Sequence, residues 1–321
     1  MDFELNDEQK QIKELVKDFC QKEIDLKRIK DIEEKVFLAK TCDEVRAVFP
    51  WDLLDKLDEV GLRQYAVPEK YGGTGPDYGG NITRLVAESE MGYRAGAAAV
   101  LLATPYMYAK AAVPSPWVTE KQKERFYADF LANPRWWVAG TVSEPSGGVD
   151  PHLPYEEPGV GLKDVFAYKD GDKWVINGNK MFCSGGAVAD TIGVLCRTDK
   201  KATLTQSATF FNVPRKTPGF SQILNRFVGI ELCGNVQNFF DNVRVPESAI
   251  LGEVNKGWYP CIYGAMMYKW LMLAPFLGEI QRVYDDVVEY AKQRVQGGKP
   301  IIKHSNVAAM LGEAAANIEA L

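Results

Sequence analysis

The fold is decided by two stretches of the chain, Thr141-Val142-Ser143-Glu144-Pro145-Ser146-Gly147-Gly148 and Asn177-Gly178-Asn179-Lys180-Met181-Phe182-Cys183-Ser184-Gly185-Gly186. The first is a polar, glycine-rich turn that leaves an apolar strand. The second is expected to be a hairpin that brings an aromatic side chain, a hydroxyl and two glycines to one place. Hydroxyls and backbone N–H groups beside glycines, which let a ligand approach closely, suit the rim of a flat cofactor. Taken alone, these residues indicate only a β-rich loop region.

The composition is that of an ordinary globular protein with a large core, since 46% of the 321 residues are hydrophobic and 25% are charged. A formal net charge of -5 gives no support to nucleic-acid binding, which favours a basic face. Six cysteines without a C-x-x-C pair, beside only two histidines, argue against a metal site. Such scattered thiols indicate a reducing compartment, and we see no signal peptide or membrane span. We therefore expect a cytoplasmic protein with no membrane partner.

The first 133 residues follow a helical pattern. Asn6 can cap a helix, with Gln9 completing a capping box. An apolar stripe at helical spacing follows, made of Leu5, Ile12, Leu15, Val16 and Phe19. Further helices are expected over residues 31–48, 51–60, 82–112 and 119–131. We expect an N-terminal helical domain over residues 1–133.

In the middle of the chain the spacing of apolar residues changes to the pattern of β-strands. Short apolar segments expected to be strands cover residues 136–142, 165–168, 174–176, 192–196, 208–213 and 236–243. The dipeptides Asp170-Gly171 and Asn177-Gly178 are typical of the turns between such strands. These features predict a central β-domain over residues 134–246.

The last part, residues 247–321, is helical again. A long, mostly apolar helix is expected from Gly257 to about Gln296, ended by Gly297-Gly298-Lys299-Pro300. A further helix begins near Ser305 and is still running at Leu321 with no cap, glycine or proline to close it. We therefore expect a C-terminal helical domain that is truncated.

Two further motifs extend the pattern. A loop with the residues Pro68, Glu69, Gly72, Gly73 and Gly75 lies in the N-terminal half. The run Phe240-Asp241-Asn242-Val243-Arg244-Val245-Pro246, followed by Leu251-Gly252 and Gly257, leaves the β-domain. Four motifs in this order resemble the acyl-CoA dehydrogenase family, over nearly the whole chain. The resemblance implies an α+β fold with an N-terminal helical domain, a central β-barrel-like domain and a C-terminal helical bundle, here incomplete.

The resemblance also implies an activity. Family members are FAD-dependent flavoproteins of fatty acid metabolism that convert an acyl-CoA thioester to a trans-2-enoyl-CoA. They pass the electrons to an electron-transfer flavoprotein and work as dimers or tetramers. Two alternatives stay open: a flavin oxidase or monooxygenase of the same fold, and a non-catalytic subunit that binds acyl-CoA.

Site residues follow from the resemblance position by position. Val142 and Ser143 match positions that contact the flavin ring. Phe182 matches a tryptophan stacked beside the ring, and Ser184 matches a threonine whose hydroxyl reaches the ring's polar edge. Arg294 matches an arginine that reaches the FAD of a neighbouring subunit.

The chain departs from the family at several positions. Val149-Asp150 replaces a Ser-Asp pair, residues 151–161 form an additional loop, and Gly297 stands where an aromatic is expected. The catalytic glutamate of most members would lie beyond Leu321. Its alternative position on the long helix is occupied by Tyr268, and a tyrosine, with an ordinary pKa of about 10, is a poor base at neutral pH. We therefore expect the base beyond Leu321.

Overall fold

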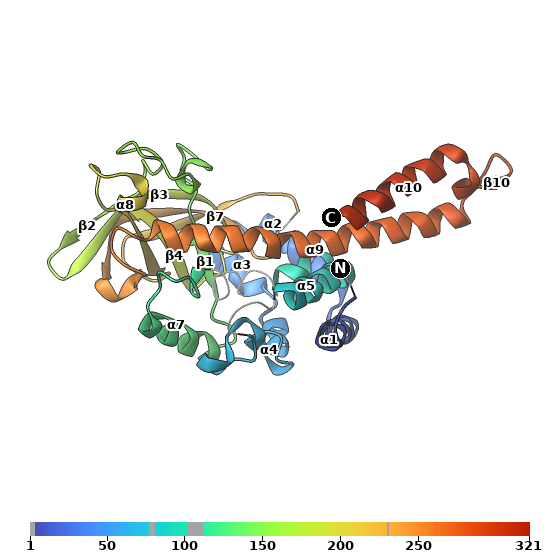
Figure 1. Ribbon diagram of the computed structural model, residues 1–321, viewed down its shortest axis with the longest axis horizontal. Coiled ribbons are helices and arrows are strands. Elements are labelled where there is room, and N and C mark those ends of the chain that lie inside the picture. The colour runs from blue at the N-terminus through green and yellow to red at the C-terminus, as the bar shows by residue number, and fades with distance from the viewer. Residues whose placement is uncertain (1–3, 77–80, 102–111, 230) are drawn as a thin grey trace. The chain divides into compact units, whose positions relative to one another are not determined.

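The structure is a computed structural model that describes residues 4–76, 81–101, 112–229 and 231–321. The chain divides into two compact units. The helical unit comprises Met1–Ile24, Gly80–Ala99 and Trp270–Leu321, and the sheet unit comprises Asp25–Gly79 and Val100–Lys269. The long helix α9 (Trp258–Gln293), drawn in orange in Figure 1, supplies residues to both units. Within the described ranges, no helix has the length and apolar character that crossing a membrane requires.

The sheet unit begins with helices, which are α2 (Leu26–Leu38), α3 (Cys42–Val48), α4 (Trp51–Glu59) and, later in the chain, α7 (Glu120–Ala132). The helix predicted over residues 31–48 was wrong, because the segment is interrupted between α2 and α3. Thr41 is the N-cap of α3 and its hydroxyl accepts a hydrogen bond from the N–H of Glu44, which starts a new helix. The predicted capped helix from Thr119 is confirmed, with Gln122 completing a capping box.

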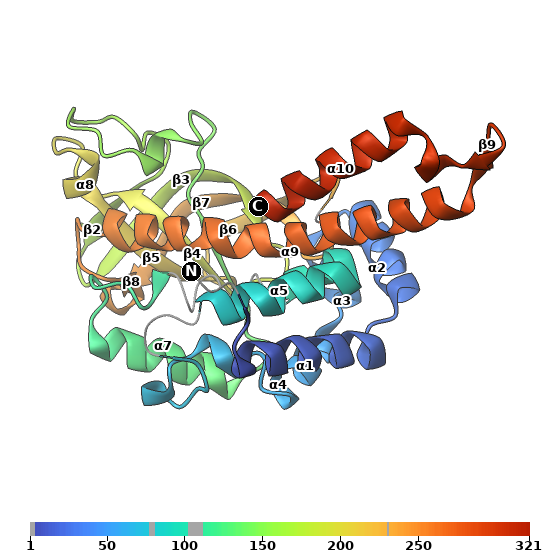
Figure 2. The ribbon, with the colours of Figure 1, turned by 45° about the vertical axis from the view of Figure 1, so that its right-hand side comes forward.

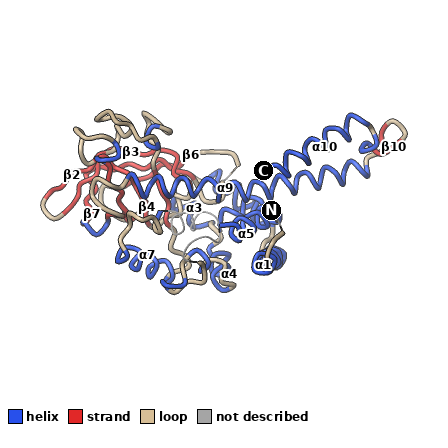
Figure 3. The backbone as a smooth tube through the Cα atoms, in the orientation of Figure 1, coloured by secondary structure: helices blue, strands red, loops and turns tan. Residues whose placement is uncertain are grey.

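Eight strands form one mixed sheet (Figure 3). They are β1 (Val138–Thr141), β2 (Phe166–Asp170), β3 (Lys173–Ser184), β4 (Thr191–Arg197), β5 (Ala208–Pro214), β6 (Phe220–Asn225), β7 (Asn235–Pro246) and β8 (Ile250–Leu251), with the short helix α8 (Leu204–Ser207) before β5. The order is β6-β7-β3-β2-β4-β5-β8, and β1 pairs in parallel with β4.

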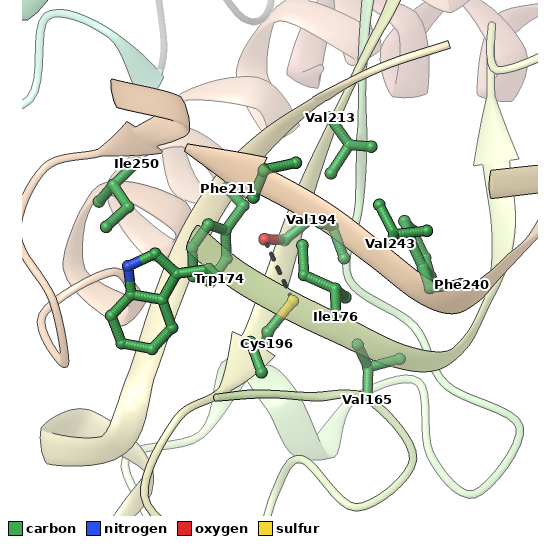
Figure 4. Packing of buried hydrophobic residues seen from close by; sticks show 12 residues of the cluster. Val165, Trp174, Ile176, Val194, Cys196, Phe211, Val213, Phe240, Val243 and Ile250 are labelled. Atoms are coloured by element: carbon green, nitrogen blue, oxygen red, sulfur yellow. Dashed lines mark hydrogen bonds between the residues drawn. The ribbon is translucent and has the colours of Figure 1, made fainter. Parts of the chain in front are cut away.

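One face of this sheet carries the apolar core of the sheet unit (Figure 4). The side chains of Trp174 and Ile176 from β3 pack there with Phe211 from β5 and Val243 from β7. Trp174 and Phe211 lie with ring centroids 5.6 Å apart. Because these strands bury alternate residues on the same face, the core fixes which side chains of β3 point inward and which point outward.

The predicted turn at Asn177-Gly178 was wrong, because β3 runs through it without interruption. Gly178 has φ +119°, and a Cβ placed there would lie 1.9 Å from the carbonyl oxygen of Asp164. This glycine therefore permits a close approach of two backbones and does not reverse the chain. The turn at Asp170-Gly171 is confirmed, with Gly171 at φ +63° between β2 and β3.

The pairing of β3 with β7 contains two opposite β-bulges. Between the pairs Ile176–Val243 and Gly178–Phe240 the extra residue lies in β7, where Asn242 has φ +51°. Between the pairs Lys180–Asn238 and Cys183–Val236 the extra residue lies in β3. The second bulge therefore restores the register that the first one shifts.

The helical unit contains α1 (Asp7–Glu23), α5 (Asn81–Ala95), the short helix η3 (Gly96–Ala99), the later part of α9, and α10 (Ser305–Ala320). The capping box of Asn6 and Gln9 at the start of α1 is confirmed. Val16 and Phe19 are buried as predicted, whereas Leu15 is 39% exposed and the apolar stripe was wrong at that position. Residues 102–111 of the helical segment predicted over 82–112 lie outside the described residues.

The helices of this unit approach closely at two glycines. A Cβ on Gly278 of α9 would lie 1.9 Å from the carbonyl oxygen of Ser89, and one on Gly92 of α5 would lie 2.1 Å from that of Pro275. After α9 the chain forms a hairpin of β9 (Val295–Gln296) and β10 (Lys299–Pro300), and α10 returns beside α9 (Figure 2). The predicted break at Gly297-Gly298-Lys299-Pro300 is this hairpin.

Candidate functional site

The bulge in β3 turns two predicted cofactor-binding side chains outward. Lys180 is buried, and simple alternation would bury Phe182 on the same face. The extra residue reverses the alternation, so that Phe182 is 53% exposed, Cys183 is buried and Ser184 is exposed. The ring centroid of Phe182 lies 5.9 Å from that of Phe227. Phe182 is therefore an aromatic surface beside a second aromatic and not a core residue.

The backbone of Phe182 is strained. It has φ +58°, in the left-handed region that bulky residues avoid. The other described non-glycine residues with positive φ are Asn242 and Asn255, and asparagine adopts this conformation readily. Such strain in a bulky residue is concentrated at functional sites, where the surrounding structure holds it in place.

Ser184 is held by a short chain of amide side chains. The Nδ2 of Asn235 donates to the Oγ of Ser184 at 3.1 Å, and the Nδ2 of Asn225 donates to the Oδ1 of Asn235 at 3.0 Å. Because this bond uses Ser184 Oγ as an acceptor, the hydroxyl hydrogen can be donated to a ligand. Asn235 and Asn225 were not predicted from the sequence.

The loop after β1 lies against the bulge. The N–H of Met181 donates to the carbonyl oxygen of Ser143 at 2.9 Å, which places the two stretches quoted at the outset side by side. Val142 and Ser143 are half-buried, and a tight turn follows in which Glu144 and Gly147 exchange backbone hydrogen bonds of 3.0 and 3.1 Å. The structure therefore brings Val142 and Ser143 next to the strand that carries Phe182.

A buried ion pair joins the two stretches. The Nζ of Lys180 lies 3.0 Å from Oε1 of Glu144, and the two side chains are 0% and 1% exposed. Neither residue was predicted, although the sequence contained a signal. Alternation from Trp174 and Ile176 places Lys180 on the buried face of β3, and a buried cation requires a carboxylate partner.

The remaining predicted site residues lie on or beside α9. Arg294 follows α9 in the helical unit, and its exposed side chain has a predicted role toward a neighbouring subunit that stays a prediction. Tyr268 is in α9, but its side chain lies outside the described residues, so its role stays a prediction as well.

The additional loop of residues 151–161 is held at both ends. The indole Nε1 of Trp258 donates to the carbonyl oxygen of Pro151 at 3.0 Å, and the Nε of Arg197 donates to that of Leu162 at 2.8 Å. His152 is the second residue of this loop, and its partial burial lowers its pKa below the usual value. Among the residues that the structure describes, no three His, Cys, Asp or Glu side chains are grouped to hold a metal ion.

Three sequence profiles match the chain. They describe the N-terminal domain of acyl-CoA dehydrogenases (residues 6–133), the middle domain (139–243) and the C-terminal domain (255–321). The short-chain specific acyl-CoA dehydrogenase of Megasphaera elsdenii is 30% identical, over 100% of this chain and 78% of that protein. The chain belongs to the acyl-CoA dehydrogenase family.

Solved structures support the same assignment. The butyryl-CoA dehydrogenase of Megasphaera elsdenii matches with a TM-score of 0.79 and 29% identity, over 100% of this chain and 78% of that one. A chain in the structure of the electron transferring flavoprotein of Acidaminococcus fermentans matches with a TM-score of 0.80 and 25% identity, over 100% and 77%. The predicted acyl-CoA dehydrogenase fold is thus confirmed, with a helical N-terminal part, a central part built of β-strands and a helical C-terminal part in chain order. Acyl-CoA dehydrogenases are flavoproteins, and this chain is an oxidoreductase of the class that acts on the CH–CH bond of an acyl-CoA.

Proposed function

We propose that the protein catalyses the FAD-dependent α,β-dehydrogenation of an acyl-CoA thioester to a trans-2-enoyl-CoA and passes the electrons to an electron-transfer flavoprotein. The bulge at Phe182 carries the proposal, because it exposes an aromatic ring and the Ser184 hydroxyl beside the loop of Val142 and Ser143. The similarity to acyl-CoA dehydrogenases supports the substrate class, and the similarity to a chain in an electron transferring flavoprotein structure supports the electron acceptor.

The residues present fit a flat ring with a polar edge. Phe182 offers an exposed aromatic face, and Ser184 offers a hydroxyl hydrogen that the hydrogen bond from Asn235 leaves for a ligand. Bound FAD would supply the chemistry by accepting the β-hydride of the substrate. The protein's part is to position the ring and the thioester and to exclude water from the base that removes the α-proton.

The first test is the visible absorption spectrum of the purified protein with FAD, followed anaerobically as a panel of acyl-CoAs is added. We expect oxidised flavin bands that one acyl-CoA bleaches. Flavin that no thioester bleaches would contradict dehydrogenation and favour the non-catalytic subunit. Reduced flavin that air reoxidises rapidly without a partner protein would favour the oxidase.

We also propose that Tyr268, which occupies the alternative helix position of the general base, is not that base. The position is a tyrosine, whereas the family's base is a glutamate. Tyr268→Phe should therefore leave the rate of acyl-CoA bleaching within about twofold of the original protein, because a phenol with a pKa near 10 removes few protons at pH 7. A decrease of more than tenfold in this rate would identify Tyr268 as the base and would contradict this proposal.

We propose further that the protein is a cytoplasmic homo-oligomer, a dimer or a tetramer. The cytoplasmic location is supported by six buried cysteines, none of which forms a disulfide. Oligomerisation is supported by a face of α9 that we call the α9 stripe, made of the exposed residues Leu273, Phe276, Ile280, Val283, Val287 and Tyr290. Their alternating spacing of three and four residues is that of a helix seam that packs against other helices.

A further inference from the structure

We propose that Glu144 and Lys180 form a positioning pair that fixes the peptide between Val142 and Ser143 so that its N–H faces the cofactor. The inference about the cofactor rests on the proposed function. The pair lies in the sheet unit, on the two stretches that carry the candidate site, and neither side chain reaches the surface. The pair therefore acts through the backbone that it holds and not through contact with a ligand.

The carboxylate of Glu144 is fully used by the protein. Its Oε2 accepts hydrogen bonds from the N–H groups of Lys163 at 2.6 Å and Asp164 at 2.9 Å. Its Oε1 accepts from the N–H of Val165 at 3.2 Å and from the Nζ of Lys180 at 3.0 Å. Four donors on two oxygens fix the carboxylate, so it is a rigid support for the Lys180 ammonium.

The second hydrogen bond of Lys180 sets the orientation of the cofactor loop. Its Nζ donates to the carbonyl oxygen of Val142 at 2.8 Å. Because a trans peptide is planar, the N–H of Ser143 points away from that carbonyl and hence away from the buried pair. Among the residues that the structure describes, no hydrogen bond uses this N–H. It is therefore presented to an acceptor from outside, such as a carbonyl or ring nitrogen at the polar edge of a flavin.

Lys180 also connects this loop to the exposed aromatic residue Phe182. Lys180 lies two positions before Phe182, and the N–H of Met181 between them bonds the carbonyl oxygen of Ser143. The Val142 and Ser143 carbonyls are thus held by consecutive residues of β3. A change at Lys180 is therefore expected to disturb the spacing between the loop and the ring of Phe182.

Stability alone is a weak reason for such a pair, because a buried ion pair can often be replaced by uncharged groups of similar size without loss. This supplies the decisive variant, Glu144→Gln combined with Lys180→Met. It removes both charges and retains similar volumes, so no unpaired charge is buried. It also removes the donor to the Val142 carbonyl and leaves that peptide without its constraint.

We expect the double variant to lower the melting temperature, because the amide nitrogen of the introduced glutamine cannot accept a hydrogen bond from the backbone N–H groups that Glu144 holds, and to raise the Kd for FAD at least tenfold. Without FAD, backbone hydrogen exchange measured by mass spectrometry should become faster in peptides that cover residues 142–148 and 179–186. The matched control is Arg63→Met, which removes a buried cation elsewhere in the sheet unit that bonds Asp58 and the carbonyl of Asn133. It should lower the melting temperature and leave the Kd for FAD unchanged.

The outcomes separate the two proposals. An unchanged Kd for FAD in the double variant, with the original protein binding FAD, would overturn the positioning role and leave the proposed function standing. If the original protein binds no FAD, the proposed function fails and the role toward a cofactor fails with it. Exchange that stays slow in both peptides of the double variant would overturn the constraint itself, whether or not FAD binds.

Discussion

Phe182 has φ +58°, and holding a non-glycine residue in this region costs about 1–3 kcal/mol. Replacing it by asparagine, which tolerates the left-handed region, should preserve the fold and raise the free energy of unfolding by up to about 1 kcal/mol. The same change removes the aromatic face, so we expect the Kd for FAD to rise at least tenfold. Thermal unfolding and FAD titration of Phe182→Asn measure the two effects.

Phe227→Ala is the control for this variant, because it removes the neighbouring ring without changing the residue at the bulge. It should leave the unfolding free energy nearly unchanged and weaken FAD binding less than Phe182→Asn does. If Phe182→Asn binds FAD as tightly as the original protein, Phe182 is not the platform for the ring.

The buried thiols make stability depend on alkaline pH. Burial raises the pKa of Cys20, Cys183, Cys233 and Cys261 to about 12. The unfolded chain releases these protons near pH 8.5, whereas the folded chain keeps them, so their contribution is complete below that pH and is lost as the pH rises toward 12. We therefore expect the urea concentration at the midpoint of unfolding to decrease as the pH is raised from 8.5 to 10.5.

Cys183→Ala removes one of these groups and should make the decline with pH less steep. In the native protein at pH 8, an aromatic disulfide reagent should react with fewer than one thiol per chain, because thiolates are the reactive form. Rapid reaction of several thiols without denaturant would contradict this burial.

At this scale the resemblance supplied Phe182 and Ser184, and the structure shows both side chains exposed. The resemblance did not indicate Lys180; its signal was the alternation that places it on the buried face of β3, but its partner Glu144, 36 positions away in the chain, could not be predicted from the local pattern. Leu15 was wrongly predicted to be buried, because helical spacing shows that an apolar stripe exists but not how wide it is.

Strand β3 depends on Gly178. With alanine there, the new Cβ would meet the carbonyl oxygen of Asp164 at 1.9 Å, in a backbone conformation that alanine avoids. We expect Gly178→Ala to lower the free energy of unfolding by at least about 3 kcal/mol. Urea unfolding followed by circular dichroism measures this change.

Gly171→Ala is the matched control, since Gly171 also has a positive φ but a Cβ added there would meet no atom within 4 Å. Gly171→Ala should lower the free energy of unfolding by only about 1–2 kcal/mol, because it adds only the strain of the left-handed conformation. Equal losses in the two variants would show that the close approach at Gly178 is unimportant.

Helix starts could be predicted because their signals are local, as the capping boxes of α1 and α7 show. The prediction of a turn at Asn177-Gly178 was wrong because Gly178 is needed for the close approach of the Asp164 carbonyl oxygen. Asp164 is a neighbour in space, so the local sequence pattern does not reveal it. Strand β6 was missed because its sequence, Phe-Ser-Gln-Ile-Leu-Asn, does not alternate cleanly between apolar and polar residues.

For the whole molecule, the α9 stripe predicts how copies associate. Val287→Glu places a charge in the middle of this apolar face, so we expect the dimer or tetramer to dissociate at micromolar concentration. Sedimentation velocity measures the change. Gln293→Glu adds the same charge on α9 outside the stripe and should leave the assembly intact. An unchanged sedimentation coefficient in Val287→Glu would show that the stripe is not the interface.

The three-part order of helices, strands and helices could be predicted from periodicity, because long segments with a constant period are the strongest sequence signal. The domain boundaries near residues 133 and 246 stay a prediction. Contacts between chain segments cannot be deduced from periodicity, which explains why α9 was not predicted to contribute to two compact units.

The opposite bulges of β3 and β7 also constrain how this sheet can change length during evolution. Deleting one residue at Phe182 alone, or at Asn242 alone, would turn every side chain beyond it onto the wrong face. Deleting one residue at both places would restore an unbroken ladder and would remove only the outward aromatic. Insertions and deletions in these two strands are therefore tolerated only when they occur together. A related protein that had lost both bulge residues would keep the sheet but would lack the exposed aromatic ring.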